Sequence, residues 1–222
     1  MGSVELDKTD RSRVRRRAER ASYDRAVVDA ILDEAFIAHV GVMSAGAPIV
    51  LPMAYGRVDD VLYLHGATAN HLLGEMKGHD ACVTVTLVDG VVLARSAFHH
   101  SANYRSVVLF GVAELVHDDV GKRRALDAIV EQVTPGRSAD ARPANAAELR
   151  ATAVLRFPIR EGSAKTRSGG PIDDPEDVGL DIWAGHVPLR SMAGPAVPAD
   201  DLPAGLGTPT YASDYRRPGT EG

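Results

Sequence analysis

The chain has 222 residues, of which 45% are hydrophobic and 25% charged, and its formal net charge is −5. These values are typical of globular proteins, so they exclude a wholly disordered chain, and the acidic balance argues against a protein that binds nucleic acid over its whole surface. A single cysteine cannot form an internal disulfide, no apolar run reaches the ~20 residues that span a bilayer, and the chain does not begin with the apolar stretch of a secretory signal. We therefore expect a cytoplasmic protein without a membrane segment.

Residues 1–21 form a basic N-terminal arm. The arginines of this arm and the helix after it are Arg11, Arg13, Arg15, Arg16, Arg17, Arg20 and Arg25. An arm that binds nucleic acid is one interpretation, and a solvated lead-in or a strap across a partner subunit is the other. The second is favoured because the rest of the chain is acidic.

The first elements predicted are a helix and a run of short strands. Ser22 is expected to cap the helix, whose apolar stripe is Val28, Ile31, Leu32 and Ala35. Strands are expected over residues 36–44, 48–57 and 61–65, with a tight turn at residues 45–47 between the first two.

Thr68 is expected to cap a second helix over residues 69–77. Further strands are predicted over residues 81–88, 91–98, 104–117 and 152–160, and helices follow Asp118 and Asn145. Short strands in meander order with inserted helices predict a mainly β fold, a closed or partly closed antiparallel barrel over residues 22–161. Residues 162–222 are rich in proline and poor in aliphatic residues, so this extension is expected to pack on the barrel or on a partner, with its last part disordered.

The residues alone suggest an anion site at the end of the third strand. His65, Gly66, Ala67, Thr68 and His71 bracket a strand-to-helix turn, where free N–H groups and small residues are able to hold a phosphate. An ordinary capped helix is the alternative.

Two further stretches stand out. Tyr104, Arg105 and Ser106 open an apolar strand and are placed to contact a planar or charged ligand; a hairpin loop whose arginine pairs a surface acid is the alternative. In the extension, Lys165 and Arg167 precede a glycine pair, and Trp183 lies where there is no core for it to join, which suggests docking against the barrel, a partner or a ligand. The spacing of the 8 histidines matches no common metal site.

These segments resemble the pyridoxamine 5′-phosphate oxidase-like flavoproteins, and most closely their 5-nitroimidazole-resistance reductases and flavin-nucleotide-binding proteins. The matching segments are Ile37-Ala38-His39-Val40, Leu51-Pro52-Met53-Ala54-Tyr55, Leu62-Tyr63-Leu64-His65-Gly66-Ala67, Asn103-Tyr104-Arg105-Ser106 with the strand that follows, and Trp183-Ala184-Gly185-His186. They span positions 20 to 190 in the expected order.

The resemblance implies a homodimer of FMN-binding split barrels, with FMN at the subunit interface. The residues that it implies for FMN binding are Pro52, Met53, Ala54, Tyr55, His65, Gly66, Ala67, Thr68, His71, Tyr104, Arg105, Ser106, Lys165, Arg167 and Trp183. His65 matches a histidine that lies beside the flavin, where it is suited to contact substrate or donate a proton; a structural strand end is its alternative.

The resemblance also implies an activity. We expect an FMN-dependent oxidoreductase that takes electrons from NADH or NADPH and acts on a small organic molecule. The phosphate-binding cluster and the C-terminal arginine-histidine motif of true pyridoxamine phosphate oxidases are missing, so that substrate is not expected. The alternatives are a flavin carrier without turnover, and the same barrel holding haem or a deazaflavin, for which His99 and His100 are the residues to test.

Overall fold

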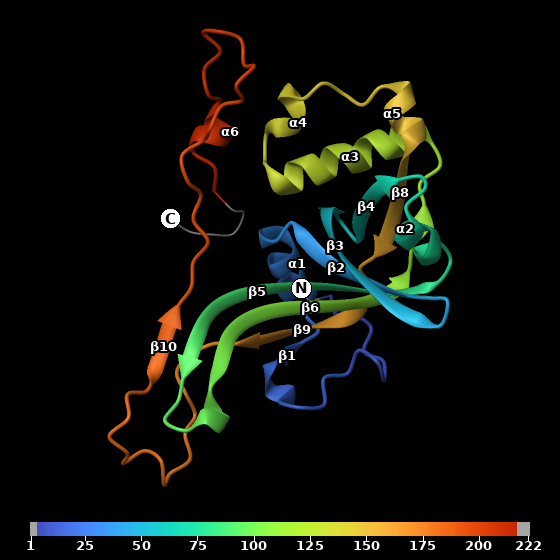
Figure 1. Ribbon diagram of the computed structural model, residues 1–222. Coiled ribbons are helices and arrows are strands. Elements are labelled where there is room, and N and C mark those ends of the chain that lie inside the picture. The colour runs from blue at the N-terminus through green and yellow to red at the C-terminus, as the bar shows by residue number, and fades with distance from the viewer. Residues whose placement is uncertain (1–3, 217–222) are drawn as a thin grey trace.

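The computed structural model describes residues 4–216, which form one antiparallel sheet curled into a split barrel with helices around it (Figure 1). The strands run in the order β1-β9-β6-β5-β2-β3-β4-β8-β7, and β10 pairs with β5. Their bounds are β1 Ala21–Ser22, β2 Ile37–Ser44, β3 Ala47–Val58, β4 Val61–Ala67, β5 Asp80–Leu93, β6 Ser101–Val112, β7 Glu114–Leu115, β8 Thr152–Pro158, β9 Glu161–Arg167 and β10 Gly185–Pro188. The predicted mainly β, antiparallel split barrel with inserted helices is confirmed.

The helices lie outside the barrel. They are α1 Arg25–Glu34, α2 His71–Met76, α3 Asp119–Val133, α4 Arg137–Asp140, α5 Ala146–Ala151 and α6 Thr210–Ser213, with short 3-10 turns at Ala18–Arg20 and Ala97–His99. Figure 1 shows α3, α4 and α5 gathered at one end, while the chain after β10 runs along one side of the molecule. No helix among the described residues is long and apolar enough to cross a membrane.

Two predicted strands prove to be one. β5 is a single strand of 14 residues, whereas the sequence suggests a break between residues 88 and 91. The Asp89-Gly90 pair does not turn the chain. It shifts the register against β6 between Val88 and Gly90, which lets the strand bend and continue. The strand predicted over residues 104–117 instead starts at Ser101 and ends at Val112, with the two-residue β7 after it.

The predicted helix caps are also corrected. The side chain of Asp24, and not that of Ser22, accepts a hydrogen bond from the amide of Ala26 at the start of α1. The side chain of Asn70, and not that of Thr68, accepts a hydrogen bond from the amide of Leu73 at the start of α2. Thr68 lies too early because β4 continues to Ala67, and the amide of Thr68 donates to the carbonyl of Ala151.

Large side chains fill the barrel. Tyr55, Phe157, Leu62, Leu64, Leu109 and Leu155 are all less than 2% exposed. The hydroxyl of Tyr55 donates to the carbonyl of Leu32 at 2.5 Å, which pins the end of α1 to β3. The side-chain amide of Gln132 on α3 donates to the carbonyls of Leu32, Asp33 and Ala35 at 2.9, 3.2 and 2.7 Å, so it satisfies carbonyls that the end of α1 leaves open.

Both ends of the chain extend the sheet. β9 pairs with β6 from Tyr104 to Phe110, so the barrel continues to Arg167, beyond the boundary expected at residue 161. The arm pairs with β9 through β1 and buries Leu6 at 5% exposure. In the extension, Asp173 forms an ion pair with Arg95 at 2.7 Å, and β10 pairs with the end of β5. Residues 1–3 of the arm and residues 217–222 of the extension, whose last part was expected to be disordered, lie outside the described residues.

Gly56 sets the distance between α3 and β3. A Cβ at this position would lie 2.5 Å from the amide nitrogen of Ile129 and 2.6 Å from the carbonyl carbon of Ala128, both backbone atoms of α3. Because backbone in the middle of a helix cannot move aside, even one methyl group forces the helix off the sheet. The absence of a side chain at Gly56 is therefore a packing requirement.

We predict that Gly56→Ala lowers the free energy of unfolding by about 1–3 kcal/mol, the usual cost of overpacking. Gly74→Ala is the matched control, because Gly74 lies in α2 with nothing within 4 Å of the added Cβ. It should leave stability unchanged or raise it by up to about 1 kcal/mol. Urea unfolding measures both variants, and equal stabilities would contradict this account of the α3 packing.

Candidate functional site

The register brings residues from several strands to one outward face of the sheet. His39 lies opposite Pro52 on one side and Thr84 on the other, and directly paired residues point to the same face. On β5 and β6, Thr84 pairs with Val108, Thr86 with Ser106 and Val88 with Tyr104. On β9, Ser106 pairs with Lys165 and Tyr104 with Arg167. We call this set the outward face: His39, Pro52, Thr84, Thr86, Val88, Tyr104, Ser106, Val108 and Lys165.

Alternation adds Ala54 and His65 to the outward face. Tyr55 and Leu64 pair with each other and point into the core, so the neighbouring Ala54 and His65 point outward. The structure therefore brings Pro52, Ala54, His65, Tyr104, Ser106 and Lys165 of the predicted set to one side of the sheet.

The outward face is exposed and carries little charge. Ile37 on β2 and Val50 on β3 are 41% and 59% exposed, and Val88 on β5 is 55% exposed. From Cys82 to Val88, the outward positions of β5 hold Cys, Thr, Thr and Val. An apolar, uncharged sheet face of this kind fits a planar ligand or a partner surface better than it fits water.

His65 lies half-buried at one side of this face. Its Nδ1 is buried and has no hydrogen-bond partner among the described residues. Burial lowers the pKa of His65 below the ordinary value of 6.5, because the imidazolium loses hydration and gains no acid in return. The side chain is therefore a neutral imidazole at neutral pH, suited to ligate a metal or accept a hydrogen bond.

The predicted anion turn is differently built. Gly66 packs tightly, since a Cβ there would lie 2.9 Å from a methyl group of Leu73. Ala67 and Thr68 are exposed, and α2 has only 6 residues. His71 Nε2 lies 2.9 Å from the hydroxyl of Ser44 and 3.8 Å from Glu75. The turn places two histidines close in sequence, but its helix is too short to act as an anion site by itself.

Arg105 points to the opposite side of the sheet, where Leu87, its partner on β5, lies in the core. Its guanidinium donates to Asp89 at 2.8 and 2.9 Å and to both carboxylate oxygens of Glu34. These two carboxylates, Asp89 first, raise the pKa of Arg105. Arg105 thus joins the end of α1 to the bend of β5. Met53 and Tyr55, two other residues expected to bind the flavin, also point toward the core and not to the outward face.

Arg167 is a buried cation without a carboxylate partner among the described residues. It is 7% exposed and donates to Asn103 and to the carbonyls of Gly169 and Gly170. Burial, and then the nearby Arg20, lower the pKa of Arg167. Lys165 beside it donates to the carbonyl of Arg16 at 3.1 Å. The edge of the outward face at β9 is therefore basic.

The remaining candidates are not among the paired strand residues that define the outward face. Trp183 is 67% exposed, and its ring packs over Gly185 at the start of β10. His99 lies 3.0 Å from Asp174, and His100 lies 2.9 Å from the carbonyl of Ser96. Among the described residues, no group of three or more His, Cys, Asp and Glu side chains could hold a metal ion.

Sequence reasoning missed the partners that fix these residues. Glu34 and Asp89 bind the guanidinium of Arg105, and Asn103 binds that of Arg167. These partners are distant in sequence, so no local pattern connects them. The sequence does offer one indication for Glu34, because a charged residue at the end of a helix with an apolar face needs a polar partner or water.

Comparison with known proteins identifies the family. Residues 24–166 match the family model described as pyridoxamine 5′-phosphate oxidase. The chain belongs to this family. The predicted resemblance is confirmed, and no curated protein matches the chain.

Solved structures give longer matches. The flavocytochrome Anf3 from Azotobacter vinelandii is 40% identical, with 94% of this chain and 97% of that chain covered and a TM-score of 0.89. A FAD and haem binding protein from Mycobacterium smegmatis is 38% identical, with 91% and 100% covered and a TM-score of 0.85. A protein from Bacteroides thetaiotaomicron described as a 5-nitroimidazole antibiotic resistance protein is 26% identical, with 65% and 85% covered and a TM-score of 0.55.

We predict that His65 makes stability depend on pH. The unfolded chain titrates near 6.5 and the folded chain lower, so between these values the unfolded chain binds more protons and the free energy of unfolding falls as the pH falls. Below both values no further loss arises from this residue. Chemical denaturation at a series of pH values should show a smaller decline for His65→Gln than for the unsubstituted chain. The exposed His186 supplies the control, and a slope altered equally by His186→Gln would speak against His65.

Proposed function

We propose that this chain is a flavin-binding oxidoreductase whose flavin lies on the outward face. The observation that carries this proposal is the arrangement of that face: an exposed apolar, uncharged centre, with the half-buried His65 at one side and the basic Lys165 and Arg167 at the other. An isoalloxazine ring needs an apolar slot with few donors, and its phosphate needs cations. Pro52, Ala54 and Ser106 would contact the ring system, and Lys165 and Arg167 would lie toward the phosphate end.

We further propose that the chain also binds haem. Two relatives that are 40% and 38% identical over more than nine-tenths of this chain are described as a flavocytochrome and as a FAD and haem binding protein. One feature of the structure supports the haem proposal: His65 is neutral, and its buried Nδ1 lacks a hydrogen-bond partner among the described residues. Haem iron takes a neutral imidazole as an axial ligand. His99 and His100 already contact Asp174 and a backbone carbonyl, so they fit less well.

The flavin is proposed to be FAD, in place of the FMN expected from the sequence. This choice rests on the Mycobacterium smegmatis relative, described as binding FAD. We also propose a homodimer, because the outward face is uncovered in one chain and the extension exposes Ile172, Ile182 and Trp183 at 63%, 49% and 67%. A second copy would bury both surfaces.

Turnover is proposed to use a reduced nicotinamide as electron donor and a small organic molecule as substrate. Reduced flavin carries the electrons, and the protein supplies position and exclusion of water. The alternative is a flavin carrier without turnover. Anaerobic addition of NADPH or NADH separates the two, since the oxidised flavin absorbance is bleached only in the first case.

We predict that protein purified after growth with a haem precursor shows both flavin absorbance and a Soret band. Mass spectrometry of the released ligands then distinguishes FAD from FMN. A colourless protein that takes up no flavin on titration would contradict the flavin assignment, and flavin without a Soret band after addition of haemin would contradict the haem assignment alone.

We predict that His65→Ala abolishes the Soret band and retains the flavin. The double variant His99→Ala/His100→Ala should keep both, because these histidines already contact Asp174 and the carbonyl of Ser96. Absorbance spectra with the flavin-to-haem ratio measure the effect. Loss of the Soret band only in the double variant would move the axial ligand to His99 or His100.

A further inference from the structure

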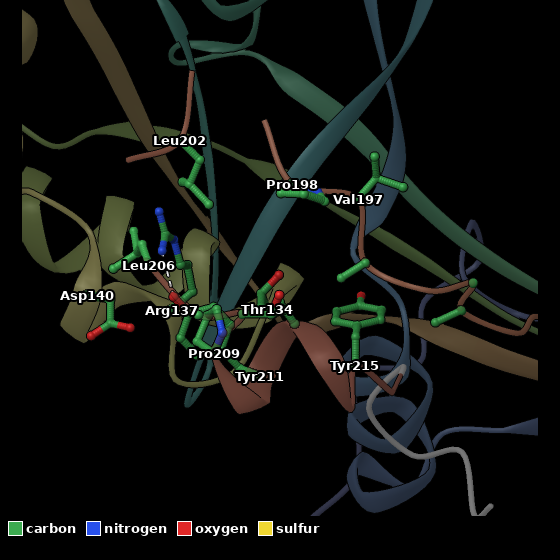
Figure 2. A pocket seen from close by; sticks show the side chains of 16 residues that line it. Thr134, Arg137, Asp140, Val197, Pro198, Leu202, Leu206, Pro209, Tyr211 and Tyr215 are labelled. Carbon is green, nitrogen blue, oxygen red and sulfur yellow. Dashed lines mark hydrogen bonds between the residues drawn. The ribbon is translucent and has the colours of Figure 1, made fainter. Parts of the chain in front are cut away.

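The structure contains a cavity that none of the residues of the outward face lines. It is open to solvent on one side and has a volume of about 910 Å³ between the end of α3, the helix α4 and the extension (Figure 2). None of the residues that the sequence or the family resemblance singles out lines it. Its volume lies within the range of small-molecule sites, ~300–1,000 Å³.

One wall of this cavity is apolar and belongs to the extension. Val197, Leu202 and Leu206 line it, and they are 90%, 42% and 61% exposed. Within residues 193–207 of the described chain, the backbone hydrogen bonds join extension residues to each other, as from Leu202 to Ala199 and from Leu206 to Pro203. This wall thus gains little burial from the protein, and a ligand in the cavity would supply it.

The opposite wall is polar and firmly held. Arg137 donates to the hydroxyl of Tyr211 at 2.6 Å and lies 5.7 Å from the centre of that ring (Figure 2). The hydroxyl of Tyr215 donates to the carbonyl of Val133 at 2.8 Å, which ties the chain after α6 to the end of α3. Among the described residues, Arg137 has a hydroxyl and an aromatic ring as its side-chain partners and no carboxylate, so its charge is not neutralised within the protein. Asp140 also lines the cavity and would repel an anion, which restricts the anionic end of a ligand to the side of Arg137.

We infer that this cavity binds an amphipathic organic anion, an apolar chain or ring ended by one carboxylate. The apolar part would lie against Val197, Leu202 and Leu206, and the carboxylate would accept hydrogen bonds from Arg137. Such a site goes beyond the proposed flavin and haem chemistry and does not depend on it.

Isothermal titration with decanoate and with decanol tests the inference, since the two probes differ in charge and share one chain length. Decanoate should bind saturably at one site per chain. Its affinity should be about tenfold lower for Arg137→Gln and several-fold higher for Asp140→Asn. The affinity for decanol should be the same in Arg137→Gln as in the unsubstituted chain. Arg150→Gln, at an exposed arginine outside the cavity, is the control for Arg137.

A second pair of variants tests the apolar wall. Leu206→Glu should abolish decanoate binding, and Val178→Glu, at a residue of the extension with similar exposure (57%) outside the cavity, should not. All these positions are exposed or lie on the cavity wall, and thermal unfolding checks that each variant is folded. Any one of three results would overturn the inference. These are an equal decanoate affinity in the unsubstituted chain and Arg137→Gln, an equal affinity for decanoate and decanol, and the absence of saturable binding.

Discussion

The barrel has no room inside, and this constraint decides where a ligand can bind. Tyr55, Phe157 and Leu64 are completely buried in its interior, and the Tyr55 hydroxyl is bonded to the end of α1. A small barrel filled by side chains leaves its outer surfaces for binding. The helix α3 covers part of that surface, because Gly56 lets it lie directly on β3. What stays uncovered is the outward face of β2, β3, β5 and β6, so the fold itself presents this face to a cofactor or a second chain.

The two ends of the chain define the limits of this face. The arm adds β1 to the edge strand β9, and its arginines make that edge basic next to the buried Arg167. The extension is held at Arg95 by Asp173 and at β5 by β10, so it starts beside the barrel and then leaves it with apolar side chains exposed. A surface that is ordered yet poorly buried needs another surface to cover it. The proposed dimer and the proposed ligand of the cavity beside α4 would each cover a different part of the extension.

Sequence patterns predicted the barrel well because alternation and turns are local signals. The strands around residues 37–44, 47–58 and 61–67 lie within a few residues of their predicted bounds, and the Ala45-Gly46 turn indeed uses left-handed backbone. The errors have physical causes. The sequence Asp89-Gly90 is typical of a turn but forms a bulge, because β6 pairs with β5 both before and after it, and β10 pairs with the part of β5 that follows. Thr68 is a good capping residue by type, but pairing of β4 with β8 carries the strand past it and leaves the cap to Asn70.

The candidate site was predictable only in part. Pro52, His65, Ser106 and Lys165 share a face because of register, which the sequence does not reveal, and the family resemblance named them without showing that they share it. Arg105 looked like a ligand residue, yet Glu34 and Asp89, which are distant in sequence, occupy its guanidinium. The cavity beside α4 could not be predicted, because its wall lies in a segment without periodic patterning.

The central claim is that flavin binds to the outward face, and blocking that face tests it most directly. Thr86 is exposed at the middle of the face, opposite Ser106, so Thr86→Trp would fill the space that an isoalloxazine ring needs. Val120→Trp, at a residue of α3 that is 78% exposed, is the matched control. Fluorescence titration of both folded variants with FAD and FMN should show flavin binding lost in Thr86→Trp and retained in Val120→Trp. Flavin affinity unchanged in Thr86→Trp would contradict the account.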